Sequence, residues 1–313
     1  MPQPVAPFLI AAAAGAAAGA ATRWWRQRHA LRVEAAAGAR LPLGPDGVII
    51  GAGALTLDRP HAPAVLLLHG AGDTPNSMRY LAGALHAAGY AVRAPLLPGH
   101  GRTIRDFAAV AEDDWMDAAR AELRELQRRH AWVAVIGLSM GGALAARLAA
   151  DPELGPSLGA VVLLAPYLTP PAPVRLAALL SHGWGALAEY VNTLDPRSIH
   201  DEQERARTIG YGIMTPAALR ALVRTARAAF EALPSVGRPT LMVHSSHDNR
   251  VAAVAARRAF ERIGTAEKRL MWREIGGHIL PVDHGRQEVF DVVLAWLAAH
   301  GGVAREAGAA PVA

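Results

Sequence analysis

The residues best suited to chemistry form a glycine-flanked serine motif, G-L-S-M-G, at positions 137–141. An apolar run over residues 132–136 precedes the motif, and a helix-like run over residues 142–150 follows it. A nucleophile elbow requires this order of strand, sharp turn and helix, with glycines that let strand and helix approach each other closely. We therefore predict that Ser139 is a nucleophile that attacks carbonyl carbon.

A serine hydroxyl is a weak nucleophile, so it needs a base within hydrogen-bond reach and an acid that orients the base. His278 fits the base because it follows a strand-like run and the permissive pair Gly276-Gly277. Asp248 fits the acid because it lies in the loop after the apolar run 240–244. Its alternative role is to cap the helix that starts near residue 251. Three further aspartates fit the acid less well: Asp195, Asp201 and Asp283.

The tetrahedral intermediate of such an attack needs two backbone N–H donors for its oxyanion. One donor is expected on the residue after the nucleophile, Met140, and the other in the loop after the first buried strand, at Ala71. His69 ends that strand, and we interpret it as a structural residue that supports the loop.

Other chemistries find little support in the composition. The 313 residues contain no cysteine, which excludes disulfides, thiolate zinc sites and cysteine nucleophiles. His244 and His247 have an H-x-x-H spacing, but they lie on a strand end and a loop, and no carboxylate set completes a metal site. We expect neither a cofactor nor a metal.

The elements around these motifs alternate between short apolar strands and helices from residue 48 onward. Strand-like runs cover residues 48–57, 64–69, 90–94, 132–136, 160–164, 239–244 and 268–275, and helical patterns cover 77–88, 114–130, 141–150 and 289–299. Continuous apolar strands separated by helices indicate an α/β fold, with a mostly parallel sheet covered by helices on both faces.

The pattern divides the chain into three parts. Residues 1–45 combine an apolar N-terminal segment with a linker from about residue 31, residues 46–301 form the predicted catalytic domain, and residues 302–313 form a flexible tail. Within the catalytic domain, residues from about 166 to 236 are too many for a plain connection, so we predict a small helical cap inserted before the acid-bearing strand.

The N-terminal run over residues 5–22 is almost uncharged and is followed directly by Arg23, Arg26 and Arg28. Its length is close to the lower limit for a membrane-spanning helix. We predict a membrane anchor with the catalytic domain on the cytoplasmic side, because basic residues flank the cytoplasmic end of a span. The alternatives are a signal peptide for export and a disordered tail on a soluble cytoplasmic protein.

The formal net charge of +5 comes mainly from arginines scattered among acidic residues. A nucleic-acid-binding surface would need clustered basic residues, and the only compact group is that of Arg23, Arg26 and Arg28. We therefore expect no nucleic acid among the partners.

Residues from about 63 to 298 resemble the α/β-hydrolase superfamily, and within it the bacterial carboxylesterase and monoacylglycerol lipase group. The resemblance rests on L-H-G at 68–70, P-L-L-P-G-H-G at 95–101, G-L-S-M-G-G at 137–142, H-D at 247–248 and G-H at 277–278. Residues 214–230 are similar to the end of the cap in that group. The resemblance implies the same nucleophile, acid, base and oxyanion donors, and it makes the loop with His100 structural. Ala71 stands where the group often has a bulkier aromatic residue.

These observations predict a serine hydrolase that cleaves carboxylic esters through an acyl-enzyme intermediate. A cap rich in Leu, Ala and Val favours short-to-medium acyl esters or monoacylglycerols as the small-molecule substrate. The alternatives are a thioesterase or acyltransferase that uses the same three side chains, and a non-catalytic binding protein on the same fold.

Overall fold

The computed structural model describes residues 6–303, except for the side chains of residues 6–17 and of Glu112. Within these residues a seven-stranded sheet has the order β1-β3-β2-β4-β5-β8-β9. Neighbouring strands are parallel apart from β1, which pairs antiparallel with β3. The strands are β1 (Leu55–Leu57), β2 (Ala64–Leu68), β3 (Ala91–Ala94), β4 (Val133–Leu138), β5 (Leu158–Leu164), β8 (Thr240–Ser245) and β9 (Lys268–Arg273). The predicted mostly parallel α/β fold is confirmed.

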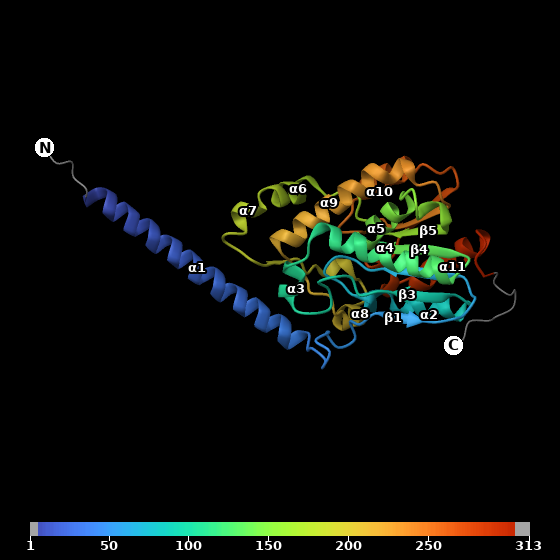
Figure 1. The fold of residues 1–313 in the computed structure, drawn as a ribbon, viewed down its shortest axis with the longest axis horizontal. Coiled ribbons are helices and arrows are strands. Elements are labelled where there is room, and N and C mark those ends of the chain that lie inside the picture. Colours follow the sequence, from blue (N-terminus) through green and yellow to red (C-terminus); the bar gives the residue numbers. More distant parts are fainter. Residues whose placement is uncertain (1–5, 304–313) are drawn as a thin grey trace.

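Helices cover both faces of the sheet (Figure 1). Side chains alternate along each strand, so Leu66 and Leu68 belong to one buried cluster and Val65 and Leu67 to the other. Buried residues of α4, α5 and α10 complete the first cluster, and those of α2 and α11 complete the second. The helices are α2 (Arg79–Ala87), α3 (Ile104–Ala108), α4 (Glu112–Arg129), α5 (Met140–Ala149), α10 (Ala253–Arg262) and α11 (Arg286–Ala299).

The chain between β5 and β8, where we predicted a cap, contains three short helices, a small two-stranded sheet and one longer helix. Its elements are α6 (Ala172–Leu179), α7 (Ser181–Trp184), β6 (Val191–Asn192), α8 (Glu202–Arg207), β7 (Ile213–Met214) and α9 (Pro216–Ala232). Strands β6 and β7 pair antiparallel. Helix α9 returns the chain to the body, since its alanines 218, 221, 226 and 229 are buried in the same cluster as α4 and α5.

The N-terminal region differs from the expected apolar segment and irregular linker. A single helix, α1 (Ala6–Arg40), continues through the residues predicted as a linker, and its N-terminal half projects away from the body (Figure 1). Alanine, arginine and glutamate favour a helix, and no proline lies between Pro7, which is in the first turn, and Pro42. Ala30 is buried against the body, and Glu34 accepts hydrogen bonds from Tyr190 Oη (2.8 Å) and Arg105 Nε (2.8 Å).

The anchor predicted over residues 5–22 receives no support from this helix. Within residues 6–303, no helix combines the length and the apolarity that a membrane span requires. Val5 and the side chains of residues 6–17 lie outside the part of the chain that the structure describes, as do residues 304–313 of the predicted tail.

The first strand is shorter than the run 48–57 that we predicted. Only Leu55–Leu57 joins the sheet, while Ile49 forms an isolated bridge with Leu43. Gly47 and Gly51 adopt φ values of 71° and 84°, which turn the backbone out of the extended conformation.

Candidate active site

Ser139 lies between β4 and α5, on the turn that the sequence predicted. Its backbone has φ 55° and ψ −114°, a conformation that a residue with a side chain rarely adopts. The surrounding glycines make the turn possible, because a Cβ at Gly137 would overlap the Gly141 carbonyl and a Cβ at Gly141 would overlap the Leu68 carbonyl. Ser139 is partly exposed, whereas the residues on either side of it are buried.

Asp248 lies in the turn after β8 and uses its two carboxylate oxygens differently. Oδ1 accepts the backbone N–H groups of Arg250 (2.7 Å) and Val251 (2.9 Å). Oδ2 accepts a hydrogen bond from His278 Nδ1 at 2.8 Å. Asp248 does not cap the following helix, because α10 begins at Ala253 and its N-cap, Ala252, has no side-chain cap bond. Oδ1 instead closes the turn after β8, while Oδ2 faces the imidazole.

His278 follows β9 and connects the other two side chains. Its Nε2 lies 2.8 Å from Ser139 Oγ, and its Nδ1 faces Asp248. The Asp248 side chain is fully buried, and that of His278 is only 8% exposed. The three residues predicted as nucleophile, base and acid thus come together in one hydrogen-bonded row, although 109 positions separate Ser139 from Asp248 in the sequence.

The charge on Asp248 is stabilised within the protein. Burial acts to raise its pKa, but the attraction and hydrogen bond of His278, together with His244 and the Val251 N–H, lower the pKa below its usual value. His244 Nε2 lies 3.7 Å from Asp248 Oδ2 and donates to the Val251 carbonyl (3.0 Å). Because burial lowers the pKa of His244, it stays neutral and Asp248 remains the anion that faces His278.

The loop after β2 lies directly against Ser139. A Cβ built on Gly70 would lie 3.4 Å from Ser139 Cβ, so the loop that carries Ala71 borders the nucleophile. The Met140 N–H is also free of an intrahelical partner, because Met140 is the first residue of α5. The loop that carries Ala71 and the first residue of α5 therefore both border Ser139.

Two buried histidines hold this loop in place. His69 Nε2 accepts the Leu97 N–H (3.2 Å), and His100 Nε2 accepts the Gly72 N–H (3.0 Å). Burial lowers the pKa of His69 to about 4, and burial and then His69 lower that of His100 well below its ordinary value. Neutral, buried and bonded to backbone, both rings support the loop and neither reaches Ser139.

Asp73, which belongs to none of the sequence motifs, lies in the same loop. Its side chain is almost fully buried, and its Oδ2 has no hydrogen-bond partner among the described residues. Burial raises its pKa to about 6, although Ser77, the Thr74 N–H, His278 and Arg79 act in the opposite direction. The only signal in the sequence is a carboxylate in a loop of small residues that follows a buried strand.

Within residues 6–303, no cluster of three or more His, Cys, Asp or Glu residues has a geometry suited to a metal ion. The imidazole of His244 belongs instead to the surroundings of Asp248.

The sheet, the strained serine turn and the hydrogen-bonded row define the class of α/β-hydrolases. Residues 59–284 match the family described as serine aminopeptidase, S33, and the chain belongs to that family. Helix α1 lies outside the matched residues.

Individual relatives agree with the predicted group. The chain is 29% identical over 238 residues to a thermostable monoacylglycerol lipase from Bacillus sp. (strain H-257), a match that covers 76% of this chain and 91% of the relative. It is 26% identical to a carboxylesterase from Bacillus subtilis (strain 168), with 75% and 92% of the two chains covered. A solved structure from work on two metagenome-derived lipolytic enzymes, LipS and LipT, is 27% identical, with a TM-score of 0.74 over 81% of this chain and 100% of that one. The predicted resemblance to bacterial carboxylesterases and monoacylglycerol lipases is confirmed.

Proposed function

We propose that this chain hydrolyses carboxylic esters with Ser139 as nucleophile, His278 as general base and acid, and Asp248 as the acid that orients the base. The observation that carries this proposal is the row of two 2.8 Å hydrogen bonds that runs from Ser139 Oγ through His278 to Asp248. The row begins at a residue held in a strained backbone turn, as a nucleophile elbow requires.

The reaction follows from the positions of these atoms. His278 Nε2 accepts the proton of Ser139 Oγ as the oxygen attacks the ester carbonyl carbon, and Asp248 stabilises the imidazolium through Nδ1. The same Nε2 then protonates the leaving alcohol, and an acyl-enzyme remains on Ser139. Water that gives its proton to His278 attacks the acyl carbonyl, and collapse of the second intermediate releases the acid and the free serine.

The N–H groups of Ala71 and Met140 are the proposed donors to the oxyanion. The negative charge develops on the carbonyl oxygen, and fixed donors at that point lower the barrier without reorganising during the step. The buried histidines His69 and His100 keep the Ala71 loop in position.

Short-to-medium acyl esters or monoacylglycerols are the proposed substrates. The cap presents exposed leucines on and around α6 and α7, namely Leu176, Leu179, Leu180 and Leu187, and an apolar surface of this kind favours acyl chains over polar groups. A relative named as a monoacylglycerol lipase and one named as a carboxylesterase support the same substrate class.

Hydrolysis of p-nitrophenyl esters from acetate to palmitate by the full chain tests the proposal, with Ser139→Ala as the matched control. We expect activity that the substitution abolishes, and the preferred acyl length measures the acyl pocket. Activity that survives in Ser139→Ala would refute the assignment of the nucleophile. Adding an alcohol or thiol acceptor distinguishes a transferase, which would form a new ester or thioester in place of the free acid.

The association of residues 5–22 with a membrane, and the cytoplasmic position of the catalytic domain, also remain proposals. The support is local: Trp24 and Trp25 are 60% and 52% exposed beside Arg23 and Arg26, a combination suited to the interface between lipid and water. Flotation of the full chain with anionic vesicles tests the association. If Trp24→Ser/Trp25→Ser floats as well as the parent chain, these two side chains do not contribute.

A further inference from the structure

The loop that carries His278 is held by backbone contacts on both sides of the imidazole. Ser245 Oγ donates to the Gly276 carbonyl (2.5 Å), and the N–H groups of Gly277 and Ile279 donate to Asp283 Oδ2 (2.7 Å) and to the Ser198 carbonyl (3.0 Å). The residues directly before and after His278 are therefore each fixed by one hydrogen bond. Both bonds connect the loop to groups outside the hydrogen-bonded row.

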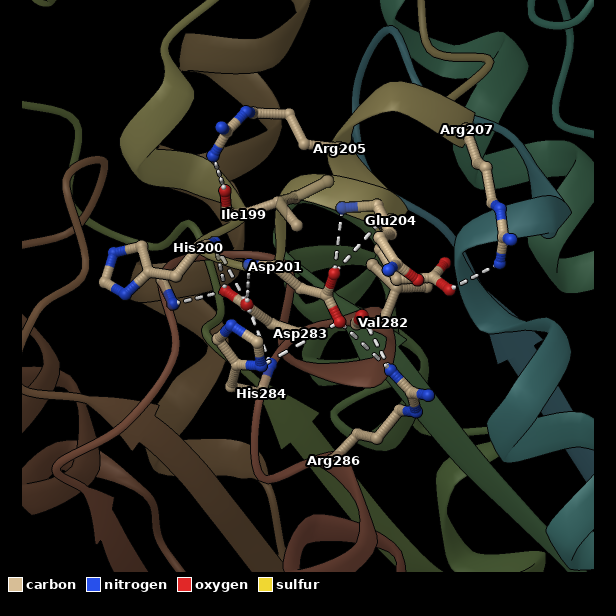
Figure 2. Close-up of polar contacts among 12 residues, drawn as sticks. Ile199, His200, Asp201, Glu204, Arg205, Arg207, Val282, Asp283, His284 and Arg286 are labelled. Carbon is tan, nitrogen blue, oxygen red and sulfur yellow. Dashed lines mark hydrogen bonds and ion pairs between the residues drawn. The ribbon is translucent and has the colours of Figure 1, made fainter.

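Asp283 is the centre of this arrangement. Its fully buried carboxylate accepts the N–H groups of Gly277, His200 (2.9 Å), Asp201 (2.8 Å) and His284 (2.8 Å). Figure 2 shows the carboxylate directed at the backbone of His200 and Asp201. Four N–H donors stabilise the anion in a buried place, since hydrogen bonds to a charged acceptor are stronger than those to a neutral one.

Two of the donors, the N–H groups of His200 and Asp201, belong to the cap. Asp283 therefore connects the His278 loop to the cap. His200 and Asp201 lie directly before α8, and the loop packs closely on the residues just upstream. A Cβ at Gly277 would overlap the Arg197 carbonyl, so only glycine allows this approach. Gly276 adopts φ 88°, which also requires glycine.

The loop that carries Asp248 contacts the same cap segment. Arg250 donates from Nε to Ser198 Oγ (3.1 Å) and from Nη2 to the Thr193 carbonyl (2.5 Å). Ser198 Oγ in turn donates to Asn249 Oδ1 (3.2 Å). The cap segment 193–201 therefore holds the acid-bearing loop through Arg250 and the base-bearing loop through Asp283.

We propose that Asp283 is a positioning residue for His278, and that with Arg250 it fixes both loops of the row on the cap segment 193–201. This inference rests on the proposed function, because it takes His278 as the base. The imidazole must keep two hydrogen bonds of 2.8 Å at once, and a misplacement of about 1 Å in such a group can cost about 100-fold in rate. Asp283 itself touches neither Ser139 nor the substrate.

The substitution Asp283→Asn tests this role, because it keeps the size of the side chain but replaces one acceptor oxygen with an amide that faces N–H donors. We expect kcat per active site to fall about 10- to 100-fold with little change in KM, because the substrate contacts remain. Active sites are counted by complete labelling with a fluorophosphonate, so misfolded molecules do not enter the rate. Asp201→Asn is the matched control, since that side chain caps α8 and its backbone N–H to Asp283 remains.

Three outcomes decide the matter. An unchanged kcat per labelled site in Asp283→Asn, with a lowered melting temperature, would reduce Asp283 to a structural role and overturn the inference. If Asp283→Asn does not fold, Arg250→Met tests the attachment of the Asp248 loop to the cap segment. We expect a smaller loss of kcat in this variant, and a kcat equal to that of the parent chain would overturn the inference. If His278→Ala keeps the activity, the proposed function itself fails, which is a separate result.

Discussion

The buried carboxyl of Asp73 leads to a prediction about stability that does not depend on catalysis. Burial raises its pKa to about 6, from an ordinary value of 3.8. The unfolded chain therefore releases this proton at a lower pH than the folded protein does. Folding stability must fall as the pH rises from about 4 to about 6, and it stays at the lower level above that range.

The size of the effect follows from the two pKa values. The difference between 3.8 and about 6 corresponds to about 3 kcal/mol of folding free energy, and most of it is lost between pH 4 and pH 7. The substitution Asp73→Asn removes the proton equilibrium and keeps the shape of the side chain. Relative to the parent chain, the variant should therefore gain stability as the pH rises through this window.

Urea unfolding of Asp73→Asn and of the parent chain at pH 4, 5, 6, 7 and 8 measures the effect. We expect the difference in free energy of unfolding to rise by about 2 to 3 kcal/mol across the series. Asp58→Asn is the control, because that side chain is exposed, and its difference from the parent should stay nearly constant. A constant difference for Asp73→Asn as well would refute the reasoning, because it would mean that the carboxyl is ionised at no cost inside the folded protein.

Four further substitutions test the site and its supports. The Ser139→Gly variant should have a free energy of unfolding about 1 to 3 kcal/mol higher than that of Ser139→Ala, because glycine tolerates φ 55°. Thermal or urea unfolding measures the difference, and equal stabilities would mean that the turn is unstrained. Asp248→Asn should lower kcat for p-nitrophenyl esters by about 10³- to 10⁴-fold, since the amide cannot fix the same imidazole tautomer, and a loss below 10-fold would contradict its role. Gly141→Ala should yield little folded protein by circular dichroism, because its Cβ would overlap the Leu68 carbonyl, and a parental yield and melting curve would be unexpected. Glu34→Gln should destabilise the protein by less than about 1 kcal/mol in urea unfolding, since Arg105 is largely exposed to solvent, and a larger loss would give α1 a greater structural role.

The predictable part of the fold is the part with strong local patterns. The strands before Ser139 and Asp248 are apolar runs, and the one before His278 is a strand-like run that leads to Gly276-Gly277, so their carboxyl ends could be placed from the sequence. Once those ends share one edge of a parallel sheet, the three side chains must converge there. The geometry of the row agrees with that reasoning to within hydrogen-bond distance.

The features that the sequence did not reveal depend on backbone groups or on distant contacts. The position of Asp283 after His278 in the chain made it a weaker candidate for the acid. No pattern of residue types records a carboxylate that binds four backbone N–H groups. The mixed composition after residue 31 also suggested a linker, although helix propensity and the contact of Glu34 with Tyr190 favour a continuous helix. The structure of such a segment depends on the residues against which it packs, and amino-acid composition does not reveal these.

The shared cap segment also bears on how enzymes of this kind change their specificity in evolution. A cap that touched only the substrate could be exchanged between relatives as an independent module. Here residues 193–201 are attached to both loops of the row, through Arg250 and Asp283. If these attachments position His278 as proposed, a new cap requires matching changes in those loops, and chimaeras that exchange the cap alone should have a displaced His278 along with the new specificity.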